Sequence, residues 1–207
     1  GLTEEYHAIN RGFDEFYGFM GRGAHPYFDH SDISHPIYRG LTPIKEEGYL
    51  TTRITEEAVD FIGRHKDEPF FLYVAYNAVH APPEAPEEDI KQVTGDETRD
   101  TLMAMIKHLD NGVGEIVNAL KKHFLFDNTL LIFLTDNGGS GTMHANNAPL
   151  RGFKQMDYEG GIHVPFIVSW PAELEGGKKC EVPMWSIDLF ATALDAAGLP
   201  MPKDKPL

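Results

Sequence analysis

The sequence has little cysteine, few basic residues and no long hydrophobic run. Cys180 is the single cysteine of the 207 residues, which excludes a disulfide within the chain and a zinc site built from several cysteines. The 18 basic residues face 32 acidic ones, and a net charge of −14 argues against nucleic acid as a partner. No stretch approaches the roughly 18 consecutive apolar residues of a membrane span. The sequence therefore predicts no nucleic acid partner and no membrane span.

The hydrophobic content of 42% is typical of a globular protein and predicts a domain with its own core. Most carboxylates are expected on a solvated surface, although acidic side chains also suit a cation. Residues 1–6 do not have the character of a signal peptide. They suggest that the sequence starts inside a longer protein.

Apolar residues at helical spacing predict three helices. The first covers 49–65 and the second 101–123, where the apolar stripe is longest. The third runs over 186–197, with Ser186 as its cap and Gly198 as a stop signal.

Three apolar segments rich in β-branched and aromatic residues predict buried strands. They are residues 70–76, 129–135 and 164–170. Residues 1–48 show no sustained period and are expected to form irregular loops. Helices that alternate with buried strands are typical of an α/β fold with a mainly parallel sheet flanked by helices. We therefore predict this fold class.

Polar residues follow two of the predicted strands, where α/β folds gather their ligands. Asp136 and Asn137 come directly after strand 129–135 and are followed by two glycines. Their oxygens suit a hard cation such as Ca²⁺ or Mg²⁺. The same residues also favour a simple turn, and the pattern alone leaves both interpretations open.

His80 and Lys154 are equally ambiguous when each is taken alone. His80 lies at the exit of strand 70–76, where a histidine is either a packed residue or a binding residue. Lys154 lies in a glycine-flanked loop and offers a compact charge to an anion. A solvated lysine, with an ion pair between Arg151 and Glu159, is the alternative.

Four segments occur together in the order and spacing of a known family. They are residues 11–18, beginning Arg-Gly-Phe-Asp; 69–82, ending His-Ala-Pro; 135–139, Thr-Asp-Asn-Gly-Gly; and 150–161, containing Leu-Arg-Gly-Phe-Lys and Tyr-Glu-Gly-Gly. In this combination the sequence resembles the sulfatase family of the alkaline phosphatase superfamily.

The resemblance implies an alkaline phosphatase-like α/β fold that is incomplete at its N-terminus. Residues 1–207 would form a partial catalytic domain, the later portion of the N-terminal α/β domain. Asp136 and Asn137 take metal-ligand roles, with Ca²⁺ as the usual cation and Mg²⁺ as the alternative. His80 and Lys154 take catalytic and sulfate-binding roles.

The sequence departs from the family pattern in several places. The family's nucleophile motif, Cys or Ser followed by x-Pro-x-Arg, is absent, and Cys180 lacks that context. Formylglycine is therefore expected upstream of this chain, and the isolated chain is expected to be inactive. His163 stands where the family commonly has arginine, and Gln155 and Met156 replace small residues.

The implied reaction is the hydrolysis of sulfate esters of carbohydrates or aryl compounds, so that the partner is a sulfated small molecule or glycan. A periplasmic or secreted location follows from the resemblance, and apolar surface at the missing part predicts self-association. Two alternatives stay open: a phosphodiesterase or phosphonate hydrolase of the same superfamily, and a non-catalytic domain that retains the fold.

Overall fold

The computed structural model describes residues 4–21, 25–30 and 36–202 of the chain. The helices are α1 (Leu50–Arg64), α2 (Glu97–Lys122), α3 (Glu159–Ile162) and α4 (Asp188–Ala196). The strands are β1 (Tyr17–Phe19), β2 (Ile37–Arg39), β3 (Thr42–Ile44), β4 (Leu131–Leu134) and β5 (Phe166–Ser169). Short 3-10 helices are η1 (Glu4–Tyr6), η2 (Ile9–Arg11), η3 (Glu87–Asp89), η4 (Phe126–Asn128) and η5 (Gly141–Met143).

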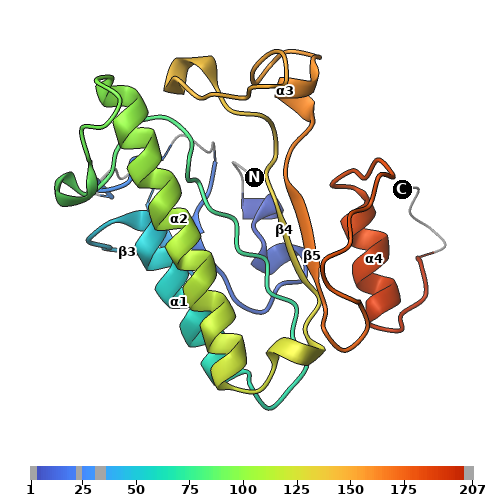
Figure 1. The fold of residues 1–207 in the computed structure, drawn as a ribbon. Helices are drawn as coiled ribbons and strands as arrows, with labels where there is room; N and C mark the ends of the chain where they lie inside the picture. Colours follow the sequence, from blue (N-terminus) through green and yellow to red (C-terminus); the bar gives the residue numbers. More distant parts are fainter. Residues whose placement is uncertain (1–3, 22–24, 31–35, 203–207) are drawn as a thin grey trace.

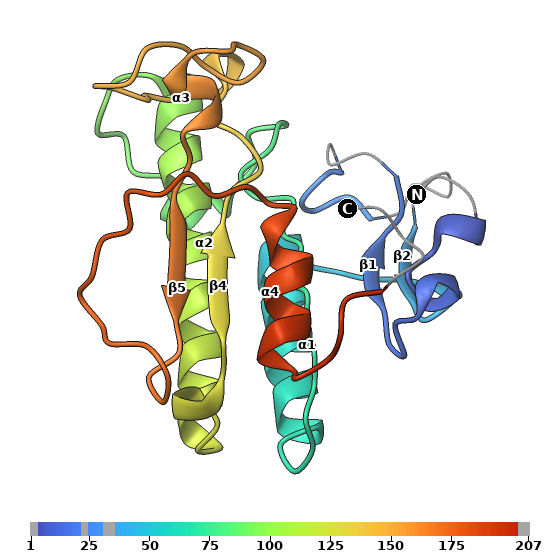
Figure 2. The ribbon, with the colours of Figure 1, turned by 90° about the vertical axis from the view of Figure 1, so that its right-hand side faces the viewer.

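The long helices form one outer layer of the molecule. Helices α1 and α2 lie side by side, strands β4 and β5 form the middle, and α4 lies on the other side (Figures 1 and 2). Apolar side chains hold the helix pair together, with Ile62 and Leu120 at 1% and 2% exposure. Both predicted long helices are confirmed. Helix α2 begins earlier than expected because Asp96 caps it, accepting a hydrogen bond from the Arg99 amide at 3.1 Å.

The α/β layering is confirmed, but the prediction of mainly parallel pairing is wrong for the described strands. Strand β5 pairs antiparallel to β4, with Leu131 opposite Ser169 and Leu134 opposite Phe166. A parallel neighbour needs a crossover, usually a helix, that carries the chain back along the sheet. Residues 135–165 contain only short helices and stay at the end where β4 stops, so β5 must run back beside β4 (Figure 1).

The predicted strand 70–76 is extended but has no ladder partner within the described residues. Its side chains alternate: Leu72 and Val74 face the helical core, whereas Phe71 and Tyr73 are 66% and 69% exposed. The segment runs toward the same end of the molecule as β4 (Figures 1 and 2). The sequence pattern therefore predicts its conformation and direction but not its pairing.

The first 48 residues are more regular than predicted. Strands β1, β2 and β3 form a small antiparallel sheet in that order, with Tyr17 opposite Arg39 and Ile37 opposite Ile44. Each strand has three residues, which is too short to show a period in the sequence. Residues 1–3, 22–24 and 31–35 of this predicted loop region lie outside the described part.

Helix α4 is confirmed, whereas its predicted cap is not. Ile187 occupies the capping position without a side-chain bond, and the Asp188 carboxylate accepts from the Trp185 amide at 2.8 Å. Gly198 ends the helix in the left-handed conformation, with φ of 67°. No helix in the described ranges combines the length and apolar character needed to cross a lipid bilayer.

Candidate functional site

The turn after β4 presents two side chains with unused oxygen atoms. Asp136 is exposed and Asn137 is half-buried. Within the described residues, neither side chain makes a hydrogen bond or an ion pair. The Thr135 hydroxyl donates instead to the Asn137 main-chain carbonyl, at 3.4 Å. The oxygens of both side chains are therefore available to a ligand.

Backbone contacts lock this turn to the loop that carries Lys154. The Gly138 amide donates to the Gly161 carbonyl at 2.9 Å, and the Lys154 amide donates to the Gly139 carbonyl at 3.1 Å. A Cβ atom on Gly138 would lie 1.8 Å from the Gly160 carbonyl oxygen. Only glycine permits so close an approach, so the glycines join the two loops as well as turning the chain.

The surroundings of Lys154 suit an anion. Lys154 is half-buried and makes no ion pair with any described residue. The Arg151 guanidinium lies 4.0 Å from the centre of the Tyr158 ring, a cation–π contact. Glu159 lies 3.1 Å from His163, and among the described residues Arg151 and Glu159 make no ion pair with each other. Two basic groups therefore remain without carboxylate partners in a chain of net charge −14.

His80 is fixed from two directions. Its Nδ1 atom lies 2.9 Å from the Ala81 carbonyl oxygen; since a carbonyl only accepts, Nδ1 carries the proton. The buried Tyr27 hydroxyl lies 2.9 Å from the carbonyl oxygens of both Asn77 and His80. Burial raises the pKa of Tyr27, so its hydroxyl stays protonated and donates. The Nε2 atom of His80 is thus left for a ligand.

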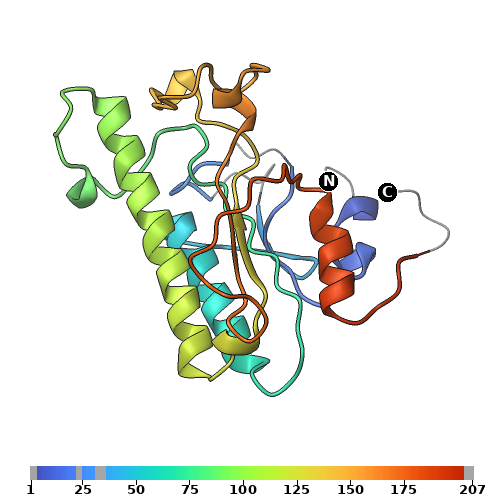
Figure 3. The same ribbon diagram turned by 45° about the vertical axis from the view of Figure 1, so that its right-hand side comes forward.

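The structure brings Asp136, Asn137 and Lys154 into one interlocked unit, and places His80 at the same end of the molecule. One apolar cluster contacts both regions. It packs against the turn with Ala78, Val79 and Ala81 and against the loop with Met143 and Ala145. Figures 1 and 3 show η5 and α3 together beyond the ends of β4 and β5. In the described residues, no hydrogen bond or ion pair joins His80 to Asp136 or Lys154. The functional roles of these four residues stay predictions.

The donors fit a hard cation in kind. Asp136 and Asn137 supply carboxylate and amide oxygens, the ligands that Ca²⁺ and Mg²⁺ prefer. No group of three or more His, Cys, Asp or Glu suited to a metal occurs among the described residues. Asp136 and Asn137 alone form a partial ligand set, because Ca²⁺ takes six to eight oxygen ligands. Cys180 is exposed and lies on the segment between β5 and α4.

Asn147 is a residue that the sequence interpretation missed. Its side chain bonds to the backbone of both Gly139 and Gly152, and so touches both loops of the site. In the sequence it belongs to Asn146-Asn147-Ala148-Pro149, which signals a turn and nothing more. No local pattern distinguishes it from a solvated asparagine.

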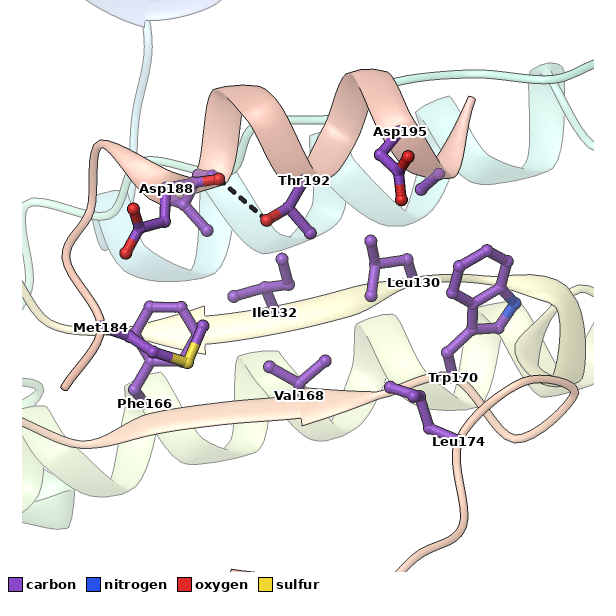
Figure 4. Close-up of a pocket in the computed structure, with 12 residues that line it drawn as sticks. Leu130, Ile132, Phe166, Val168, Trp170, Leu174, Met184, Asp188, Thr192 and Asp195 are labelled. Carbon is purple, nitrogen blue, oxygen red and sulfur yellow. Dashed lines mark hydrogen bonds between the residues drawn. The ribbon is translucent and has the colours of Figure 1, made fainter. Parts of the chain in front are cut away.

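A separate cavity of about 230 Å³ lies between α4 and the β4–β5 pair (Figure 4). Its lining is mainly apolar, with Ile132, Phe166 and Val168 on the strands and the carboxylates of Asp188 and Asp195 at its edge. Apolar walls and acidic groups do not suit an anion. This cavity is therefore distinct from the site around Lys154.

The fold and the site define an α/β protein in which a turn with free carboxylate and amide oxygens lies against the loop of an unpaired lysine, beyond the end of a strand. Comparison with known proteins agrees with this description. The profile of the Sulfatase family matches residues 2–199. The chain therefore belongs to the sulfatase family.

Individual relatives match nearly the whole chain. The chain is 37% identical to the uncharacterized sulfatase YdeN of Escherichia coli (strain K12), over 98% of this chain and 36% of the relative. It is 32% identical to N-acetylgalactosamine-6-sulfatase of Mus musculus, over 99% of this chain and 42% of the relative. A crystal structure of Ps i-CgsB in complex with k-i-k-neocarrahexaose matches with a TM-score of 0.91 and 35% identity, over 98% and 49% of the two chains.

These relatives are two to three times as long as the chain, which spans 36% to 49% of their lengths. The match confirms the family and the alkaline phosphatase-like α/β fold. The predicted division into a partial catalytic domain, residues 1–207, stays a prediction.

Proposed function

We propose that the protein of which this chain is part hydrolyses sulfate esters. The observation that carries this proposal is the bond between the Lys154 amide and the Gly139 carbonyl, 3.1 Å long. It ties an unpaired ammonium group to the turn of Asp136 and Asn137. A sulfate group carries negative charge on several oxygens, so one oxygen can bind a cation while another binds a lysine.

Each residue takes a role that its surroundings permit. Asp136 and Asn137 would hold Ca²⁺, or alternatively Mg²⁺, through their unused oxygens. Lys154 would offset the charge of the sulfate as a compact cation. Since Nδ1 of His80 already donates to Ala81, His80 donates from Nε2 only as imidazolium, to the sulfate or to the leaving oxygen. Formylglycine, the family's nucleophile, would supply covalent attack on sulfur.

We propose a sulfated glycan as the substrate class, with a sulfated aryl compound as an artificial substrate. Two comparisons support the choice: the relative named N-acetylgalactosamine-6-sulfatase and the structure in complex with k-i-k-neocarrahexaose. Exposed side chains beside Lys154, Phe153 and Tyr158 at 37% and 46%, offer an apolar and aromatic border for a sugar ring.

The test is hydrolysis by the gene product that contains this chain, with calcium present. Lys154→Ala is expected to lower kcat/KM for 4-nitrophenyl sulfate and for a sulfated glycan by about 100-fold. Lys178→Ala is the control, because Lys178 is an exposed lysine paired with Glu175 at 2.7 Å. Faster turnover of a phosphate diester or phosphonate would favour the related phosphate enzymes. Absence of turnover and of cation binding would favour a non-catalytic domain.

We also propose that the 207-residue chain is inactive when isolated and self-associates in solution. Phe71 and Tyr73 project from the extended segment 70–76 at 66% and 69% exposure, and exposed apolar faces of this kind promote association. Light scattering that shows a clean monomer at high concentration would contradict the second part. A periplasmic or secreted location is the third proposal, and cell fractionation tests it.

A further inference from the structure

The side chain of Asn147 forms a clamp between the two loops of the site. Its Oδ1 atom accepts from the Gly139 amide at 3.1 Å. Its Nδ2 atom donates to the carbonyl oxygens of Gly139 and Gly152, each at 3.0 Å. An amide side chain accepts through its oxygen and donates twice through its nitrogen, whereas a carboxylate cannot donate, an ammonium group cannot accept and a hydroxyl has a single proton. Asn147 thus engages the peptide groups on both sides of Gly139 as a neighbouring strand would.

Gly139, the residue that Asn147 holds, connects the turn of Asp136 and Asn137 to the loop of Lys154. The Gly139 carbonyl accepts from Asn147 and also from the Lys154 amide, at 3.1 Å, so both of its lone pairs are used. Gly139 follows Asn137 by two positions in the same turn. The placement of Asp136 and Asn137 relative to Lys154 therefore passes through a peptide group that Asn147 holds.

The contact between Asn147 and Gly139 depends on the residue type at both positions. A Cβ atom on Gly139 would lie 2.6 Å from the Ala145 Cβ atom and 2.8 Å from Oδ1 of Asn147, so these two side chains together occupy the space where a side chain would be. Asn147 is half-buried, which shields these three bonds from water. Its neighbour Asn146 is exposed, and within the described residues its side chain bonds to the Ala148 amide alone, at 3.0 Å.

We propose that Asn147 is a positioning residue for the sulfate-ester reaction, an inference that rests on the proposed function. It holds the oxygens of Asp136 and Asn137 at the spacing from Lys154 that allows one sulfate group to bind the cation and the ammonium together. It does not itself touch the substrate. Partners that orient ligating groups in this way matter for ligand binding nearly as much as the ligands do.

The first test measures the clamp without any reaction. In the 207-residue chain, Asn147→Ala is expected to speed amide hydrogen exchange at Gly139 and Lys154 by about 10-fold or more. The Gly139 amide loses its acceptor, and the bond from the Lys154 amide to the Gly139 carbonyl loses the side chain that holds that carbonyl. Calcium affinity, measured by calorimetry, is expected to fall by about 10-fold. Asn146→Ala, the matched control, should leave both quantities unchanged. Unchanged exchange in Asn147→Ala would overturn the inference.

The second test measures the reaction in the gene product that contains this chain. Asn147→Ala is expected to lower kcat/KM by about 10-fold to 100-fold and to raise the calcium concentration needed for half-maximal activity. Asn147→Asp keeps the acceptor for the Gly139 amide but turns a carboxylate oxygen toward the Gly139 and Gly152 carbonyl oxygens, so it should lower kcat/KM at least as much as Asn147→Ala does. Wild-type kinetics in Asn147→Ala, or a loss explained entirely by a smaller folded fraction, would contradict a positioning role.

The two tests separate this inference from the proposed function. If the unsubstituted protein hydrolyses no sulfate ester, the proposed function fails, and Asn147 is not a positioning residue for that reaction. If it does hydrolyse sulfate esters while Asn147→Ala matches it in exchange, calcium affinity and rate, the clamp fails and the proposed function stands.

Discussion

Helices α1 and α2 and the loop region 135–163 are held together by different forces. The helix pair buries large apolar side chains, among them Ile62, Met105 and Leu120. In the loop region the buried residues are Met143, Gly160 and Gly161, and backbone hydrogen bonds between glycine-rich turns replace a core. The helix pair thus depends on the area that it buries, whereas the loops depend on how closely their backbones approach.

This difference places the largest buried apolar contacts and the candidate site in separate regions of the molecule. Side-chain burial supplies stability, which changes gradually with the volume of each residue. Interlocked turns fix the relative positions of the site residues, and a single added atom at a close backbone contact disrupts those positions. The residues proposed to bind cation and sulfate belong to the second kind of region. Substitutions in the two regions should therefore differ in kind.

The largest expected effect is in the helical core. Met105 is fully buried on α2, and Met105→Ala should lower the free energy of unfolding by about 3 kcal/mol through the cavity that it leaves. Met103, on the same helix, is 41% exposed, and Met103→Ala should change stability by about 0.5 kcal/mol or less. Urea denaturation measures both. Equal effects of the two substitutions would show that α2 is not held by burial.

Adding one methyl group in the loop region should also lower the free energy of unfolding, by somewhat less than the core substitution. Gly138→Ala places a Cβ atom against the Gly160 carbonyl oxygen and should cost about 2 kcal/mol. Gly141→Ala is the control, because its Cβ would lie no closer than 3.7 Å to the Phe153 ring. Thermal denaturation distinguishes them. A tolerated Gly138→Ala would mean that the two loops are not interlocked.

Removing a side chain next to Lys154 should instead stabilise the loops. Gln155 adopts a φ of 73°, a conformation that costs a non-glycine residue about 1 kcal/mol. Gln155→Gly is therefore expected to raise the free energy of unfolding by about 1 kcal/mol. Gln92→Gly, at an exposed position with negative φ, should lower it. A destabilised Gln155→Gly variant would show that the Gln155 side chain makes a contact worth more than this strain.

The smallest effect is expected at an exposed ion pair. Arg64, hydrogen-bonded to Glu15 at 2.8 Å, lowers the pKa of Glu15 to about 2. A carboxylate with a depressed pKa stabilises the fold above its unfolded pKa, and this contribution is lost as the pH falls from about 4.3 toward about 2. Because the pair is exposed, the contribution is below about 1 kcal/mol.

The substitution Glu15→Gln tests this contribution across that pH range. The variant should be slightly less stable than the wild type at pH 7, and the gap should close in acid. Asp14→Asn removes a neighbouring carboxylate that makes no ion pair in the described structure, and should show no such convergence. A gap that widens in acid would contradict the assignment.

The same contrast explains what could be predicted from the sequence. Helices α1 and α2 and strand β4 leave periodic apolar patterns, because each buries a face or a run of side chains. The antiparallel pairing of β5 with β4 leaves no such pattern in the sequence, since the direction of β5 depends on how loop 135–165 folds. The contact of the Asn147 amide with Gly139 is set by two loops in three dimensions, and asparagine in a turn has many other uses.

The candidate site was predictable only through the combination of segments. Asp136, Asn137, His80 and Lys154 each have an ordinary alternative, and the family resemblance united them. The structure brings the first two together with Lys154 through backbone bonds. His80 lies at the same end of the molecule, fixed by Tyr27. The physical reason for their proximity, glycine backbones in contact, appears in the sequence only as Gly138-Gly139 and Gly160-Gly161.

The most direct test of a shared cation and sulfate site is an NMR titration of the 15N-labelled chain with calcium and then with inorganic sulfate. We expect calcium to shift the amide signals of residues 136–139, and sulfate, added with calcium present, to shift those of Lys154 and Gly139 together. Sulfate should bind more weakly without calcium, because the two ions share one site. Shifts confined to distant surface residues, or sulfate binding at Lys154 that is indifferent to calcium, would contradict the account.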